Sequence, residues 1–247
     1  MKRLLKVTLA MMAAFILSMP IYSGFYKVSA KDFDYQYQIG DTEKETYYNI
    51  FLNLEARELG IDTEGKDKQQ LEEDVKETKI KRAAEEKGME TEGEDIEELG
   101  KEVHHKEVQE QAEKLGIKQK GKDPQLLAEK VYEALLKQKA ADLDVDTEGK
   151  KIDDLKKAVL IALLKQEADT LGLETDGMDI HELQQAVHEA KVTRTAQALE
   201  LETDGQETSE LFHEIMTQHA VRAKKQHLYP FESDQGLFFN GYHMTNT

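Results

Sequence analysis

The stretch Leu59-Gly60-Ile61-Asp62-Thr63-Glu64-Gly65-Lys66-Asp67 decides the fold of this chain, because versions of it recur along most of the sequence. Each copy has an alanine nine residues before its second glycine, a leucine six residues after it, and a valine or isoleucine ten residues after it. The second glycine returns every 28 residues, at Gly65, Gly93, Gly121, Gly149, Gly177 and Gly205. Such self-similarity at one fixed period is typical of proteins built from repeated structural units.

Each repeat carries signals for one helix start and one helix end. Asp123-Pro124 has the order of an N-cap residue and a first helical position, where the missing proline amide costs nothing. The equivalent aspartates precede Gln or Glu by three residues, as in a capping box: Asp67 with Gln70, Asp95 with Glu98, and Asp179 with Glu182. At the other end stand glycines where helices stop in a left-handed residue: Gly60, Gly88, Gly116 and Gly172. One repeat is therefore predicted to be roughly 20 residues of helix and a loop of about seven.

The apolar positions change sides near the middle of each predicted helix. At about 100° per residue, Leu155 and Val159 lie on one side, whereas Leu164, Ala168 and Leu171 lie on the opposite side. The packing unit is then the second half of one helix, the loop, and the first half of the next helix. A helix that breaks in its middle would give the same pattern. One unit has too few apolar positions for a core of its own, so neighbouring units must stack.

These patterns predict an all-α protein in which residues 56–220 form a tandem array of six 28-residue helix-loop-helix repeats. Residues 31–55 would be an aromatic N-terminal cap and first helix, and residues 221–247 an aromatic C-terminal tail. The tail would be either disordered or a small hairpin that turns at Asn240-Gly241. Its aromatics would cover the last core of the array or bind a partner, with Phe238, Phe239 and Tyr242 as the candidate binding residues.

Residues 1–30 have the features of a signal peptide. Lys2, Arg3 and Lys6 form a basic head, an uncharged apolar stretch follows, and Val28-Ser29-Ala30 supplies small residues, so we expect cleavage between Ala30 and Lys31. An uncleaved anchor is the alternative, because the apolar stretch has about the length of a membrane span. Cleavage would remove four cations and no anion, which changes the net charge from −17 to −21. The mature protein would then be secreted or at the cell surface, outside the membrane.

The sequence offers no familiar catalytic nucleophile. It contains no cysteine, and only Ser209 and Ser233 remain after cleavage, neither of them in a Gly-x-Ser-x-Gly elbow. His181-Glu182 resembles the start of a zinc-protease helix, but the next histidine, His188, follows seven residues later rather than four. Seven residues return to the same helix face, so this pair remains a candidate for a shared metal. We therefore predict that the protein is not an enzyme and uses no cofactor.

A calcium site is the other metal hypothesis. Asp144, Asp146 and Glu148 alternate ahead of Gly149, as the first ligands of an EF-hand loop do. The twelfth position of that loop needs a bidentate glutamate and here is Leu155. We therefore expect diffuse cation binding rather than a specific site, with Asp144, Asp146 and Glu148 as the candidate ligands.

The run Ile80-x3-Ala84-x3-Gly88-Met89-x3-Gly93-x5-Leu99-x3-Val103 resembles the helix–extended loop–helix motif of SAP-like and LEM-like small domains. The resemblance implies a short helix, a loop with a buried aliphatic residue, and a second capped helix. SAP-like members usually bind nucleic acid through basic residues on the second helix. Here that helix carries acidic residues, such as Glu97, Glu98 and Glu102. The resemblance therefore extends to the fold and not to the nucleic-acid function.

Together these features predict an exported, non-enzymatic structural or protein-interaction repeat protein at the bacterial cell surface or in the medium. Its partner would be an unidentified protein or cell-envelope component, because an acidic surface repels nucleic acid and attracts cations or basic partners. Two alternatives stay open: an extracellular nucleic-acid-binding protein of SAP type, and a secreted enzyme or inhibitor with an unrecognised site.

Overall fold

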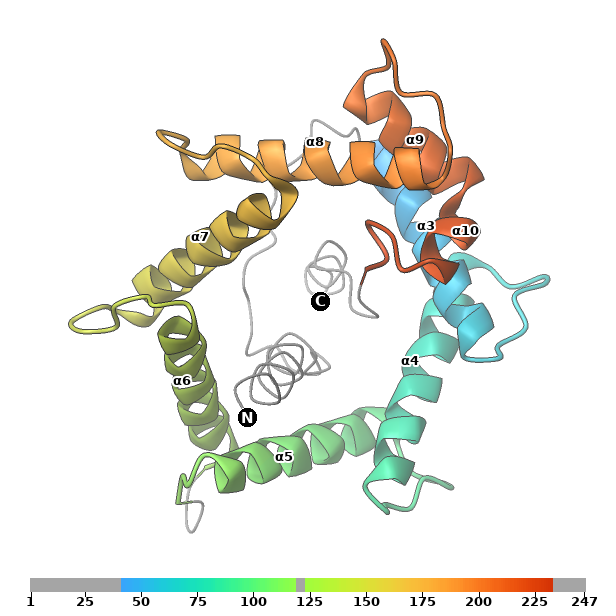
Figure 1. The fold of residues 1–247 in the computed structure, drawn as a ribbon. Coiled ribbons are helices and arrows are strands. Elements are labelled where there is room, and N and C mark those ends of the chain that lie inside the picture. The colour runs from blue at the N-terminus through green and yellow to red at the C-terminus, as the bar shows by residue number, and fades with distance from the viewer. Residues whose placement is uncertain (1–40, 119–122, 233–247) are drawn as a thin grey trace, which may run out of the picture. The chain divides into compact units, whose positions relative to one another are not determined.

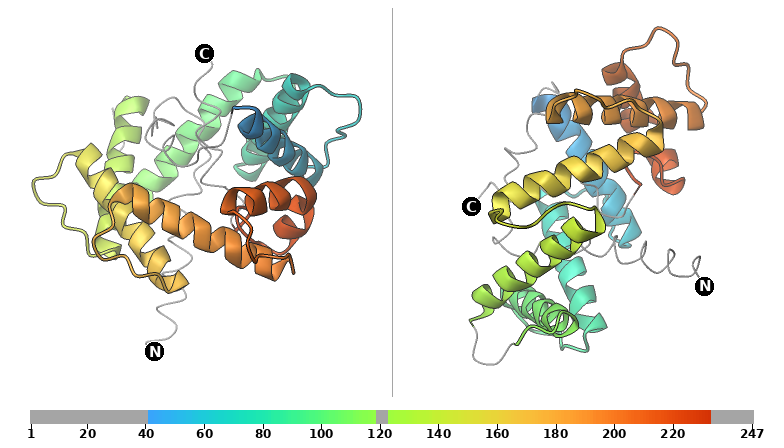
Figure 2. Two further views of the ribbon diagram at one scale, coloured as in Figure 1. Left: turned by 90° about the horizontal axis from the view of Figure 1, so that it is seen from above. Right: turned by 60° about the vertical axis from the view of Figure 1, so that its left-hand side comes forward.

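The computed structural model describes residues 41–118 and 123–232. This part of the chain is all-α, as the repeats predict, and holds no strand (Figure 1). Figure 2 shows the same helices from two further sides. The helices are α3 (Asp41–Glu58), α4 (Lys68–Glu86), α5 (Ile96–Lys114), α6 (Pro124–Asp142), α7 (Ile152–Leu171), α8 (Ile180–Ala198), α9 (Thr208–Gln218) and α10 (Ala220–Lys225). The segment 1–30 and the tail residues Phe238, Phe239 and Tyr242 lie outside the described residues.

The chain divides into two compact units whose boundaries fall inside α5 and α8. One unit contains His104–Leu183, and the other combines Lys27–Val103 with Gln184–Thr247. The second unit therefore joins segments from the two ends of the repeat array. Each unit is described by itself below.

Helix ends follow one design in all six copies. The amide of the aliphatic residue after the helix donates to the carbonyl of the repeat alanine at 2.8–3.0 Å, from Ile61 to Ala56 in the first copy and from Leu201 to Ala196 in the last. The same bond is made in the copies between them, and all six alanines are fully buried: Ala56, Ala84, Ala112, Ala140, Ala168 and Ala196. This bond satisfies a carbonyl that the helix end leaves without a partner. The repeat alanine is therefore fixed by a backbone bond and by close packing together.

The residue between the helix and that aliphatic residue adopts the left-handed conformation that the sequence predicts. It is glycine in four copies, with φ between +65° and +77° at Gly60, Gly88, Gly116 and Gly172. Asp144 and Glu200 occupy the same place in the fourth and sixth copies, with φ of +55° and +60°. A side chain raises the energy of this conformation by roughly 1 kcal/mol or more. Two helix ends are therefore strained where the repeat departs from glycine.

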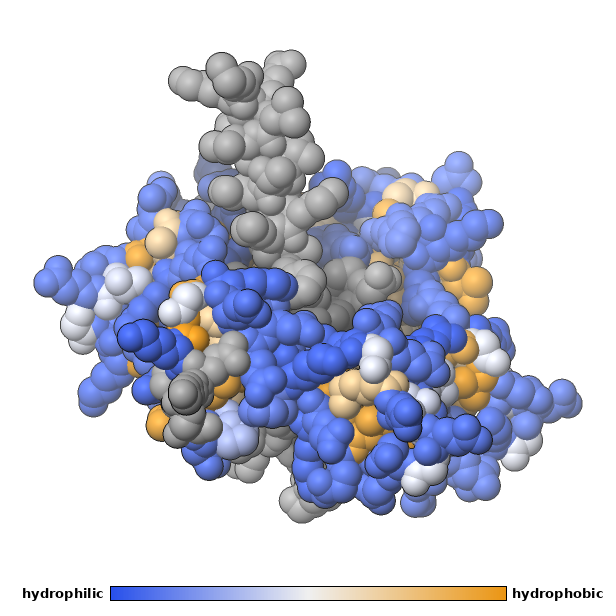
Figure 3. All heavy atoms as spheres, turned by 90° about the horizontal axis from the view of Figure 1, so that it is seen from below, coloured by the Kyte–Doolittle hydropathy of each residue, from blue (hydrophilic) through white to orange (hydrophobic). Residues whose placement is uncertain are grey.

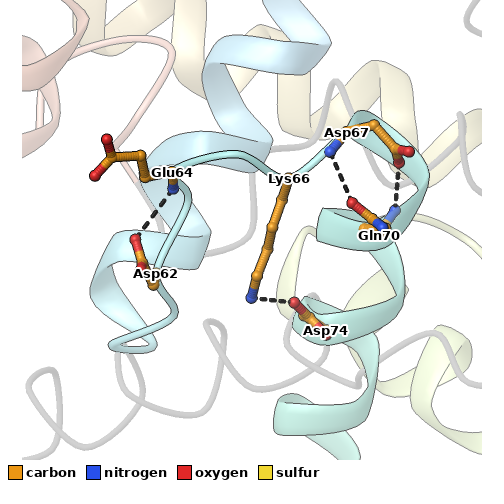
Figure 4. A network of polar contacts seen from close by, with 6 residues as sticks. All are labelled: Asp62, Glu64, Lys66, Asp67, Gln70 and Asp74. Carbon is orange, nitrogen blue, oxygen red and sulfur yellow. Dashed lines mark hydrogen bonds and ion pairs between the residues drawn. The ribbon is translucent and has the colours of Figure 1, made fainter.

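Helix starts are capped at the predicted aspartates (Figure 4). The Oδ1 atom of Asp67 accepts the amide of Gln70 at 2.9 Å, and the Gln70 side chain accepts the amide of Asp67 at 3.0 Å. Asp179 and Glu182 form the same reciprocal pair, at 3.0 and 2.8 Å. Asp95 and Asp123 also accept amides of their first helical turns. In the fourth and sixth copies, α7 and α9 start without a side-chain cap.

Apolar clusters confirm that the packing unit spans two helices. Residues from the second half of α3 pack with the first half of α4, in a cluster of Tyr48, Leu52, Ala56, Leu71 and Val75. The same arrangement joins α5 to α6 and α6 to α7 in the unit that contains His104–Leu183. Helices α4 to α8 run for 19 or 20 residues without a break. Each of these helices therefore changes its buried side near the middle and stays intact.

Candidate binding site between the first and last described helices

A seventh copy of the helix end follows the six periodic ones. The amide of Leu228 donates to the carbonyl of Ala223 at 2.9 Å, and His227 between them has a φ of +51°. Ala223 is fully buried, like the repeat alanines. It follows Ala196 by 27 residues rather than 28, and the helix is interrupted between α9 and α10. The missing residue hides this copy from a search at a fixed period, although the Ala-x4-Leu spacing is intact.

Helix α3 packs against this last copy. Tyr47 of α3 lies 28 residues before Val75, and its side chain is buried with residues of α8, α9 and α10. Its hydroxyl lies 3.0 Å from Nδ1 of His213, and its ring meets Phe212 edge-on with 5.4 Å between centroids. The cluster consists of Tyr47, Leu54, Val192, Ala196, Leu199, Leu211, Phe212, Ile215, Met216, Ala220, Ala223, Tyr229 and Phe231. The first helix thus supplies to the last copy the half-helix that a further repeat would have supplied.

Two further contacts hold the same surfaces together. The rings of Phe51 and Phe231 lie 4.6 Å apart between centroids. The ammonium of Lys224 on α10 lies 2.8 Å from a carboxylate oxygen of Glu58 at the end of α3. Aromatic contacts between buried rings contribute more than exposed ion pairs do, so the aromatic cluster dominates this packing.

His188 lies inside this unit and is buried, with Nδ1 2.8 Å from the hydroxyl of Tyr229. Burial, and then the charge of Lys191, lowers the pKa of His188 to about 3. The imidazole is therefore neutral at physiological pH and bonded to a tyrosine. His181, its predicted companion, is exposed. The two histidines thus occupy different environments, and the bond to Tyr229 gives His188 a structural role.

An open groove lies between α3 and the α9–α10 segment. Its volume is about 410 Å³, within the range of ligand-binding clefts. The lining comprises Thr46, Asn49, Ile50, Asn53, Leu54 and Arg57 on α3, and Met216, Thr217, Gln218, Ala220 and Val221 on the other side. Leu54, Met216 and Ala220 belong to the buried cluster, whereas Val221 is 62% exposed. The groove therefore has an apolar base that continues the core outward.

The polar groups of the groove differ in what they already bond. Asn53 donates to the carbonyl of Asn49 at 2.8 Å, and the hydroxyls of Thr46 and Thr217 donate to carbonyls one turn back in their own helices. Arg57 is exposed and is the single charged residue of the lining. Among the described residues it makes no side-chain hydrogen bond or ion pair. Its five N–H donors are therefore available to a ligand.

The candidate calcium ligands form a turn. Oδ1 of Asp146 accepts the amide of Glu148 at 3.0 Å, and Asp62 makes the same bond to Glu64 in the first copy. The other oxygen of Asp146 lies 3.8 Å from the ammonium of Lys150. Across residues 41–118 and 123–232, no group of three or more His, Cys, Asp or Glu side chains is arranged to hold a metal ion. The carboxylate of Asp146 therefore serves the loop conformation in this structure.

No protein-family model matches the chain, and neither a curated protein nor a solved structure is similar to it. None of the described helices combines the length and the apolar character that a membrane crossing requires. In Figure 3 the face in view is mostly hydrophilic, with separate small apolar areas, which agrees with a charged fraction of 34%.

Proposed function

We propose that this chain is an exported, non-enzymatic repeat protein that binds another protein or a cell-envelope component. The observation that carries the proposal is the use of the repeated residues. The alanines accept loop amides, the glycines provide left-handed turns, and the aspartates cap helices. What repeats is therefore a scaffold, and recognition is left to residues that differ between copies.

The electrostatics favour a protein partner over nucleic acid. The net charge of −17 repels phosphate backbones, and a chain that starts at Lys31 would be more acidic still. Nucleic-acid binding of the SAP type remains the alternative that a direct test must exclude. We infer export from the basic and apolar N-terminal segment, with cleavage between Ala30 and Lys31.

Two measurements test this proposal. Mass spectrometry of the exported protein should give the mass of a chain that begins at Lys31; the intact chain retained in the membrane would contradict cleavage. For binding, the processed protein is immobilised and exposed to an envelope extract, and each captured component is purified and titrated separately. Saturable binding of one component supports the proposal. Titration with double-stranded DNA at low salt should show no binding, and a steep salt dependence would instead support the nucleic-acid alternative.

A further inference from the structure

We propose that the groove between α3 and the α9–α10 segment binds the C-terminal end of a peptide, with apolar side chains along the groove and the terminal carboxylate at Arg57. This inference deepens the proposed binding function and rests on it. The argument depends on the chemistry of the lining, its length, and the place where it ends.

The lining is unusual for this chain in its charge. A third of all residues are charged and acids outnumber bases by 50 to 33, yet the groove holds no acid and one cation. An exposed guanidinium beside an apolar base fits a ligand that is apolar along its length and anionic at one point. Arg binds carboxylates through two parallel hydrogen bonds, so Arg57 has both the charge and the geometry for that point.

The length of the groove suits a short extended segment. Thr46 and Arg57 are the two ends of the α3 lining, and at about 1.5 Å per residue they are separated by roughly 16 Å. An extended peptide covers that distance with about five residues. Ile50, Leu54 and Val221 provide apolar contact, and Asn49 and Gln218 carry amides that can bond the peptide backbone.

The end of the lining favours a chain terminus over an internal acidic residue. Arg57 is the penultimate residue of α3, and the next residue is Glu58, whose carboxylate is paired with Lys224. A peptide that continued past Arg57 would meet this acid. A peptide that ends at Arg57 places its α-carboxylate on the guanidinium and goes no further.

The test uses fluorescence anisotropy with three labelled pentapeptides and the whole protein. The probes are Gly-Thr-Ile-Thr-Leu with a free carboxylate, the same peptide as its C-terminal amide, and Gly-Thr-Ile-Glu-Leu as its amide. We expect saturable binding of the first and about tenfold weaker binding of the second, because a charge-assisted contact is lost. The third should bind no better than the second. If it binds as tightly as the first, an internal carboxylate is recognised and the assignment of a chain terminus is overturned.

Variants separate the groove from the rest of the surface. Arg57→Gln should weaken the free-carboxylate peptide to the level of its amide and leave the amide unchanged. Arg194→Gln, at an exposed arginine of α8 outside the lining, is the matched control and should change neither. Val221→Asp should weaken both peptides at least about tenfold, because an anion then stands on the apolar wall. Since Arg57 and Val221 are exposed, circular dichroism should show unchanged folding for both variants.

Equal binding of acid and amide, or no effect of Arg57→Gln, would overturn the assignment. So would the absence of binding by all three peptides at about 1 mM, a concentration that detects even weak complexes. That last result leaves the proposed function intact if an envelope component is still captured, because capture then uses another surface. Conversely, peptide binding without any captured component would locate a site and contradict the envelope partner.

Discussion

The hydroxyl of Tyr47 lies 3.0 Å from Nδ1 of His213, although 166 residues separate them in the sequence. This contact joins the first described helix to the last copy of the repeat and lies in an aromatic cluster with Phe212. It shows that the repeat array uses its own first helix to cover its final apolar surface. The candidate groove exists only because these two segments meet.

Removal of the Tyr47 ring should destabilise the protein strongly. Tyr47→Ala should lower the free energy of unfolding by about 3–5 kcal/mol, as deletion of a buried aromatic ring does. Tyr47→Phe keeps the ring and should cost about 1 kcal/mol, the net value of one hydrogen bond. Urea unfolding followed by circular dichroism measures both. Equal losses for the two variants would show that the ring packing contributes little.

The buried repeat alanine should not tolerate a larger side chain. Ala140 is fully buried, whereas the neighbouring Ala141 is exposed on the same helix. Ala140→Leu should therefore destabilise the protein by about 1–3 kcal/mol through overpacking. Ala141→Leu has the same helix propensity change and should stay within about 0.5 kcal/mol of the wild type. A thermal or urea melt of the pair decides the matter, and equal melts would contradict the packing argument.

Glycine at the two strained helix ends should stabilise the protein. Asp144 and Glu200 hold left-handed φ values, which glycine adopts without steric cost. Asp144→Gly and Glu200→Gly should each raise the free energy of unfolding by about 0.5–1 kcal/mol, less what glycine loses in entropy. The reverse change Gly172→Ala meets no atom within 4 Å, so its cost of about 1 kcal/mol should be conformational alone. Destabilisation by both glycine variants would indicate that the acidic side chains matter more than the backbone.

The buried His188 should make stability depend on acid. Its pKa is lowered to about 3 in the fold, whereas an unfolded histidine titrates near 6.5. The neutral form is favoured by the fold, so its contribution is complete above pH 6.5 and is lost progressively as the pH falls from there toward 3. His188→Gln removes the titration. Between pH 7 and 4.5 the wild type should therefore lose about 2 kcal/mol more than the variant, measured from urea midpoints. Parallel losses would mean that His188 is protonated without cost.

Much of the fold follows from local sequence. The caps at Asp67 and Asp179, the left-handed glycines and the change of buried side at the middle of α7 are all visible as residue spacings. These features depend on neighbours within one or two turns, so their physics is contained in short stretches. Repetition strengthened each signal, because one reading had to suit six copies.

The sequence by itself determined the helices, their ends and the two-helix packing unit, because capping, backbone conformation and helical periodicity act over a few residues. Only the tertiary structure decided that α3 packs on α9 and α10, that His188 is buried against Tyr229, and that Arg57 faces an apolar groove. Those relations join residues far apart in the chain, and their signal is a shape complementarity between two surfaces that no spacing records. The copy ending at Ala223 lies between these cases, since a deletion of one residue removed it from the period while its local bonds kept the motif.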